Sequence, residues 1–146
     1  MPFLYLVLNI AWLGFGGFVS ALGWLVAGII MAITVVGLPW ARAAFNIATY
    51  TLFPFGTKAV PRADLTQRSD IGTGWMGTVG NVIWFVFAGW WLALLHVAFA
   101  VAFFVTIIGI PFGWAHLKLA RLALWPIGQS IVGIDAFRMM QDRSAR

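Results

Sequence analysis

One sequence unit occurs twice in this chain, and the repetition constrains the fold more than any other feature. Residues 34–39 read Thr-Val-Val-Gly-Leu-Pro, and residues 106–111 read Thr-Ile-Ile-Gly-Ile-Pro. The offset is 72 residues (106 − 34 = 72). Without a gap it also relates Asn9 to Asn81, Trp12 to Trp84, Gly17 to Gly89, Pro54 to Pro126 and Gly56 to Gly128. Repetition at a fixed period predicts two copies of one structural unit.

The charged residues fall in two short stretches, 42–70 and 118–146, and the blocks 1–41 and 71–117 carry no formal charge. Overall 62% of residues are hydrophobic and 9% are charged, whereas soluble domains have about 25% charged residues. Each apolar block is about 40 residues long, which suffices for two membrane spans of roughly 17–20 residues. The composition therefore predicts an integral membrane protein.

Charge also predicts the topology. If each apolar block is a hairpin of two spans, turning at the glycine-rich residues 16–20 and 88–92, all basic segments lie on one face. The positive-inside rule makes that face cytoplasmic, together with both termini, and the two copies then have parallel topology. In the alternative, residues 3–16 are re-entrant and each copy crosses the membrane once. The polar loop and the tail then lie on opposite faces.

The repeated motif is predicted to end a spanning helix and to begin another helix. Proline disfavours the helical region for the residue before it, yet it fits the first turn of a new helix. Gly37, Pro39, Gly109 and Pro111 are therefore predicted hinge residues. The segment after each hinge is amphipathic, as expected for a helix at the membrane surface.

These features predict an all-α integral membrane protein with two tandem copies of a transmembrane hairpin, each followed by an amphipathic interfacial helix. The expected division is a first repeat at 1–56, a polar loop at 57–73, a second repeat at 74–130 and a soluble basic tail at 131–146.

Residues suited to catalysis or cofactor binding are scarce. The chain has no cysteine, its four acidic residues are all aspartates, and all four lie outside the apolar blocks. The residues that thiol and paired-carboxylate mechanisms require are therefore missing from the apolar blocks. We expect no enzyme, cofactor or metal site. His96 and His116 are far apart in sequence and are interpreted as packing or interfacial residues. Residues 72–77 match G-x-G-x-x-G, but no strand precedes them and no acid lies about 20 residues on, so nucleotide binding is not indicated.

Polar residues inside the apolar blocks allow two interpretations. Asn9 and Asn81 either hydrogen-bond a neighbouring helix or line a polar pathway together with Thr34, Thr106 and Gly109. Arg42, Lys118 and Arg121 either extend to lipid headgroups or form a basic mouth that favours anions. The net charge of +5 follows from the positive-inside rule and does not indicate nucleic-acid binding.

The paired motifs resemble the YccF family of bacterial inner-membrane proteins. The resemblance rests on Asn9-x-x-Trp12, Gly17, Thr34-Val-Val-Gly37-Leu-Pro39 and Pro54-x-Gly56, and on their second copies Asn81-x-x-Trp84, Gly89-Trp90-Trp91, Gly109-Ile-Pro111, Lys118 and Leu124-Trp125-Pro126-x-Gly128. It covers the chain to about residue 130 and implies a multi-pass protein of the inner membrane. Because the family is a domain of unknown function, it implies no reaction or ligand. The copies differ where Arg42 and Asn46 correspond to Trp114 and Lys118.

Two functions fit these observations. The first is a homo-oligomeric ion channel or small-solute conduit, because polar stripes occur in a chain too small to enclose a pore alone. The second is a non-conducting scaffold or accessory subunit that binds a partner protein or anionic lipid through its aromatic and basic surface. An enzyme acting on lipid is a distant third.

Overall fold

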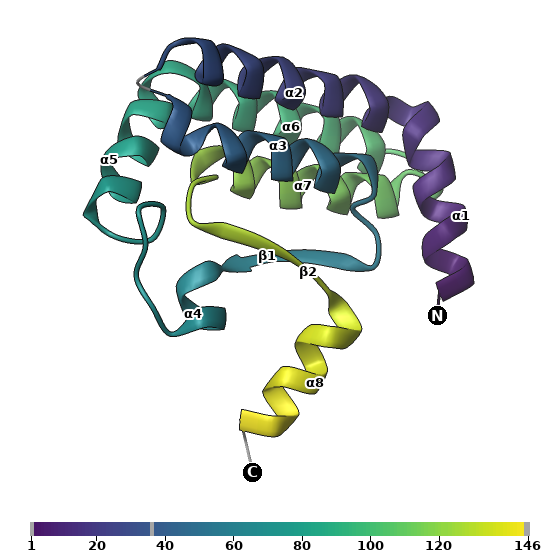
Figure 1. Ribbon diagram of the computed structural model, residues 1–146. Helices are drawn as coiled ribbons and strands as arrows, with labels where there is room; N and C mark the ends of the chain where they lie inside the picture. The colour runs from purple at the N-terminus through teal and green to yellow at the C-terminus, as the bar shows by residue number, and fades with distance from the viewer. Residues whose placement is uncertain (1, 36, 145–146) are drawn as a thin grey trace.

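The computed structural model describes residues 2–35 and 37–144 of the chain. The elements are α1 (Pro2–Trp12), η1 (Leu13–Gly17), α2 (Phe18–Ile33), α3 (Leu38–Leu52), β1 (Thr57–Pro61), α4 (Arg62–Thr66), α5 (Trp75–Trp84), η2 (Phe85–Gly89), α6 (Trp90–Phe104), α7 (Ile110–Leu124), β2 (Gln129–Gly133) and α8 (Ile134–Ser144). The fold is mostly helical with the same order of helices in both copies, as predicted (Figure 1).

Each apolar block begins as one long helix with a bend in it. Phe3–Ile33 and Trp75–Phe104 are each long and apolar enough to cross a membrane. The bends lie in η1 and η2, and in η1 the backbone of Phe15 and Gly16 leaves the helical region. In η1, Gly16 has φ +106°, and α1 runs at a steep angle to α2 (Figure 1). The hairpin turns expected at 16–20 and 88–92 are therefore bends, which is a correction to the sequence prediction.

The hairpins close one element later, at the repeated motif. α2 packs along α3, and α6 packs along α7. α2 ends at Ile33 and α3 begins at Leu38, with Pro39 in its first turn. A side chain at Gly37 would place its Cβ 2.7 Å from the Met31 carbonyl oxygen, so the turn is tight enough to require glycine. The helix break predicted at the motif is thus present, and it reverses the chain.

The helices after the motif are amphipathic, as predicted. On α3 the residues Arg42, Asn46 and Thr49 are exposed, and on α7 Lys118 and Arg121 are exposed. The opposite faces are buried; on α7 this face includes Phe112, Ala115, His116, Leu119, Leu122 and Ala123. The apolar faces of α3 and α7 pack against α2 and α6, respectively, and against the other copy.

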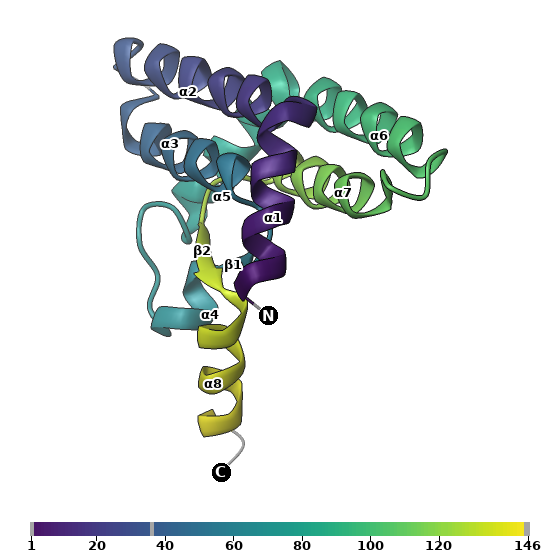
Figure 2. The same ribbon diagram turned by 90° about the vertical axis from the view of Figure 1, so that its right-hand side faces the viewer.

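A two-stranded antiparallel ribbon, which the sequence did not predict, joins the two copies. β1 lies in the segment expected to be a loop, β2 follows the second copy, and Ala59 pairs with Ile131. These two residues are equivalent under the repeat offset (131 − 59 = 72). A local two-fold axis therefore passes between them and relates the two strands. Accordingly, the α2/α3 and α6/α7 hairpins point in opposite directions from the centre (Figures 1 and 2).

The ribbon also bears on the choice between the two predicted topologies. Strands that pair directly must lie on the same side of a bilayer, so residues 57–61 and 129–133 share one face. One crossing per copy would place the two strands on opposite sides, so the pairing favours the hairpin topology. The chain between the strands therefore returns to the side from which it started.

This result predicts the labelling of cysteine variants. The parent chain has no cysteine, so Ser69→Cys and Asp142→Cys, both at exposed positions, are single reporters for the two polar segments. Both are expected to react with a membrane-impermeant maleimide in inside-out vesicles and not in intact spheroplasts, because the positive-inside rule makes their face cytoplasmic. Labelling of the two variants from opposite sides would contradict the ribbon.

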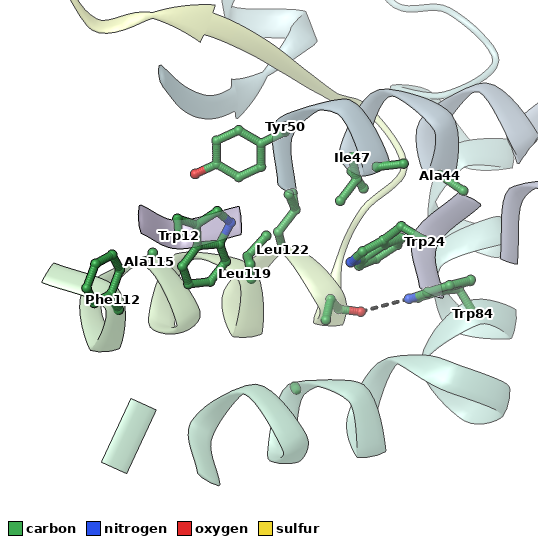
Figure 3. Packing of buried hydrophobic residues seen from close by; sticks show 13 residues of the cluster. Trp12, Trp24, Ala44, Ile47, Tyr50, Trp84, Phe112, Ala115, Leu119 and Leu122 are labelled. Atoms are coloured by element: carbon green, nitrogen blue, oxygen red, sulfur yellow. Dashed lines mark hydrogen bonds between the residues drawn. The ribbon is translucent and has the colours of Figure 1, made fainter. Parts of the chain in front are cut away.

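The buried core lies between the copies and is rich in aromatic rings. Trp24 of α2 stacks on Trp84 of α5 with ring centroids 5.3 Å apart, and Trp12 stacks on Phe112 of α7 at 6.3 Å. Figure 3 shows the two tryptophans Trp24 and Trp84 side by side, with the hydrogen bond from the Trp84 indole. Each copy therefore contributes a tryptophan that packs against the other copy.

Candidate functional site

The paired Asn-x-x-Trp motif holds the end of each hairpin. The Asn81 side-chain amide donates to the Ile127 carbonyl and accepts from the Ile127 N–H, both at 3.0 Å. The Trp84 indole N–H donates to the Ala123 carbonyl at 2.7 Å. In the first copy Asn9 makes the same two bonds to Phe55, at 3.0 and 3.1 Å, and Trp12 bonds Thr51 at 2.7 Å. We call each set of three bonds the Asn–Trp clasp. It fastens the first helix of a copy to the last turn of its last helix, through Trp, and to the chain just after that helix, through Asn.

The polar residues that were predicted to line a pathway all hydrogen-bond to the backbone of their own chain. The amide nitrogen and oxygen of Asn9 and Asn81 both bond the chain's own backbone, at Phe55 and Ile127 just after α3 and α7. Thr34 and Thr106 lie in the two hairpin turns, which are at opposite ends of the helical layer (Figure 2). The Thr34 hydroxyl donates to the Met31 carbonyl at 2.9 Å, and that of Thr106 donates to the Phe103 carbonyl at 3.2 Å.

Gly109 also lies in a hairpin turn and not beside the asparagines. It is buried, and an added Cβ would overlap the Phe103 carbonyl. Its N–H donates to the Thr106 hydroxyl at 3.0 Å, and Pro111 follows in the first turn of α7. The five predicted pathway residues thus occupy four separate places: two clasps and two turns.

The three basic residues that were predicted to form one mouth lie at different places in the structure. Arg42 and Lys118 are exposed on α3 and α7, whereas Arg121 borders a pocket of about 730 Å³ beneath α7. The pocket is lined from β1, α4, α7 and α8 by Lys58, Ala59, Val60, Pro61, Asp64, Leu65, Gln67, Arg121, Phe137, Met140, Gln141 and Arg143. Three of these residues are cationic and one is anionic, a net formal charge of +2 (3 − 1 = 2). We call it the basic pocket.

Local contacts order the segments in and next to the basic pocket. The Lys58 ammonium lies 4.1 Å from the centroid of the Phe137 ring, a cation–π contact that joins β1 to α8. Arg62, just after β1, forms a bidentate pair with Asp70 at 2.7 Å. This hydrogen bond lowers the pKa of Asp70 to about 2, so the pair persists through neutral pH. The Asp70 carboxylate also accepts from the Gly72 and Thr73 N–H groups.

That turn explains the G-x-G-x-x-G match at 72–77. Gly77 faces the Gly72 carbonyl so closely that an added Cβ would overlap it, and α5 begins at Trp75. A loop, and not a strand, precedes the glycines. The glycines at 72–77 serve a close turn before a helix.

A buried histidine pair was missed by the sequence analysis. His96 of α6 and His116 of α7 are 5% and 2% exposed, and their Nδ1 atoms are 3.0 Å apart. Both residues lie ten positions from Thr106 (106 − 96 = 10 and 116 − 106 = 10), so a hairpin closing at the motif places them opposite each other. Because the hairpin turn was predicted at 88–92, the two histidines were not expected to face each other. Among the described residues, no group of three or more His, Cys, Asp or Glu could hold a metal ion.

Comparisons with known proteins agree with the repeat and the membrane assignment. The family model described as "YccF: Inner membrane component domain" matches residues 7–57 and again residues 79–129. The chain is 38% identical over 143 residues to the "Inner membrane protein YccF" of Escherichia coli (strain K12) and likewise to that of Shigella flexneri, covering 96% of this chain and 95% of each relative. No solved structure matches.

The two matched segments contain the clasps, the hairpin turns and the amphipathic helices, and each ends where a ribbon strand begins. Together they account for most of the chain. With its doubled motif, its two long apolar helices and its close similarity to these relatives, the chain belongs to the YccF family of inner membrane proteins.

Proposed function

We propose that this protein is a non-conducting, non-enzymatic inner-membrane protein that binds the headgroup of an anionic phospholipid in the basic pocket. The observation that carries the proposal is the convergence of Lys58, Arg121 and Arg143 on one pocket with a single acidic neighbour, Asp64. Cationic side chains near a membrane surface attract anionic headgroups by about 1 kcal/mol each.

The position of the pocket supports a lipid rather than a ligand from bulk water. Arg121 belongs to α7, a helix of the apolar hairpin layer, whereas the other lining residues belong to the polar ribbon, α4 and α8. The pocket therefore lies where the apolar and polar layers meet. Trp125, at the end of α7, is 45% exposed, and exposed tryptophan is typical of the membrane–water interface.

Native mass spectrometry in detergent tests this function. The parent protein is expected to retain phosphatidylglycerol in preference to phosphatidylcholine. The double variant Arg121→Gln, Arg143→Gln is expected to bind phosphatidylglycerol about 30-fold more weakly, because two cations that contribute about 1 kcal/mol each are lost from the pocket. The matched control is Arg42→Gln, Arg68→Gln, which removes two cations that do not line the pocket.

Equal loss in the pocket variant and the control would mean that net charge, and not the pocket, determines binding. A further arm adds inorganic phosphate in excess. Complete displacement of the lipid by phosphate would show that a free anion is the ligand and would overturn the lipid assignment.

The homo-oligomeric conduit remains a second candidate. The observation in its favour is that Lys118 and the turn residue Thr106 have exposed side chains, which a second copy can enclose. Planar-bilayer recording tests it. Conductance that changes its anion selectivity in Lys118→Gln would support the conduit, whereas silence of a folded protein supports the lipid-binding proposal.

A further inference from the structure

Among the described residues, no straight helical segment is long enough to cross a membrane alone. The apolar helices Phe3–Ile33 and Trp75–Phe104 have the necessary length, but each is bent at η1 or η2 (Figure 1). The parts on either side of the bends have 11 and 16 residues in the first copy, and 10 and 15 in the second. At 1.5 Å per residue these parts are about 15–24 Å long, whereas the hydrocarbon core of a bilayer is about 30 Å thick. A crossing would therefore need two parts that run in steeply different directions.

The polar segments lie on one side of both hairpins. In Figures 1 and 2 the ribbon, α4 and α8 lie below the helical layer, and α2 and α6 form its upper side. The ribbon is close to both copies, because β2 contacts α3 and the basic pocket brings β1 together with Arg121 of α7. In contrast, α2 and α6 have no charged residue, and side chains such as Val19 (72%) and Val101 (61%) are exposed. One side of the molecule thus suits water and the other suits hydrocarbon.

The two hairpin tips are apolar and point in opposite directions. Val35 and Ile107 are 75% and 88% exposed at the two tips, and they are equivalent under the repeat offset (107 − 35 = 72). The two-fold axis between Ala59 and Ile131 places the ribbon midway between the tips. If the hairpins stood upright in a bilayer, the tips would lie on opposite faces and the ribbon, with Lys58, would lie near the bilayer centre. Charged side chains are costly there, so an upright orientation is strongly disfavoured.

We propose that both hairpins lie flat in a single leaflet of the membrane, with their tips surrounded by acyl chains, and that neither hairpin crosses the bilayer. The partner of the surface formed by α2, α6 and the tips is then the hydrocarbon interior of that leaflet. The depth agrees with this orientation. Helices α1 and α5 run from the polar side up to the α2/α6 layer (Figure 1), and their 11 and 10 residues span about 15–16 Å, half of the hydrocarbon thickness of about 30 Å. Both strands stay on one side of the bilayer, as the ribbon requires. The proposal does not depend on headgroup binding in the basic pocket.

Cysteine accessibility at the tips tests the proposal. Val35→Cys and Ile107→Cys each place one reporter at an exposed tip of a chain without cysteine, and Ser69→Cys is the matched control in the exposed polar loop. We expect a membrane-impermeant maleimide to label neither tip variant, in intact spheroplasts or in inside-out vesicles, and to label both after the membrane is dissolved in denaturing detergent. Ser69→Cys is expected to react in inside-out vesicles. Labelling of either tip in either intact membrane would overturn the proposal.

A nitroxide label on the same cysteines measures depth, because oxygen concentrates in hydrocarbon and a charge-neutral nickel chelate concentrates in water. In liposomes we expect the labels at Val35→Cys and Ile107→Cys, and a third at Val101→Cys on α6, to collide more often with oxygen than with the chelate. The label at Ser69→Cys is expected to show the reverse. A preference for the chelate at either tip would mean that the tip emerges from the membrane and would overturn the proposal. Low collision rates with both reagents at Val101→Cys would mean that a second copy, and not lipid, covers α6, and would also overturn it.

Discussion

Replacement of Asn81 by alanine is expected to lower the stability of the protein by about 2–5 kcal/mol. The change removes both bonds to Ile127, whose backbone N–H and carbonyl are then buried without partners, since Ile127 is 4% exposed. Each unsatisfied buried group costs about 1–3 kcal/mol. Thermal unfolding in detergent, followed by intrinsic tryptophan fluorescence, is expected to shift downward by roughly 5–20 °C.

Two further asparagines provide the comparison. Asn46→Ala changes an exposed side chain on α3 and is expected to alter stability by no more than about 0.5 kcal/mol. Asn9→Ala breaks the equivalent clasp, but its partner Phe55 is only half-buried, so the loss should be smaller than at Asn81. If Asn81→Ala unfolded at the temperature of the parent, the clasp would not be a source of stability.

The sequence was sufficient to predict the repeat, the membrane assignment and the helices on either side of the motif. Those predictions depend on local information: the offset of 72 residues, the confinement of charge, and the backbone chemistry of Gly37 and Pro39. Proline cannot continue the helix before it and suits the first turn of the next helix, so the bounds of α2 and α3 follow closely from the motif.

The elements that were missed depend on contacts between distant residues. Glycine near residue 16 weakens a helix whether the chain bends or reverses, and the contacts made around the bend, such as the Trp12 bond to the Thr51 carbonyl, join distant residues. The ribbon pairs residues 57–61 with 129–133, and neither segment alternates clearly enough to indicate a strand. His96 and His116 face each other only if the hairpin turn lies at the repeated motif. Because the turn was predicted at 88–92, no feature of the sequence indicated that they pair.

Gly17→Ala is expected to destabilise the protein by about 2–4 kcal/mol, because the bend has no room for a side chain. The new Cβ would overlap the Trp12 indole at Nε1 and Cδ1. Trp12 is completely buried, and its indole N–H is bonded to the Thr51 carbonyl. Moving the ring therefore costs that bond in addition to the overpacking penalty of about 1–3 kcal/mol. The unfolding temperature in detergent measures the loss.

A glycine in the same π-helical turn provides the control. Around Gly14 no atom lies within 4 Å of an added Cβ, so Gly14→Ala is expected to be neutral or to stabilise by up to about 1 kcal/mol through helix propensity. In the second copy, Gly89→Ala would bring its Cβ to 2.9 Å from the Ala123 carbonyl oxygen, which is the acceptor of the Trp84 bond. It should therefore also destabilise. Equal stability of the Gly17 and Gly14 variants would mean that glycine is needed at the bend for flexibility alone, and not for the close contact between the bend and the clasp.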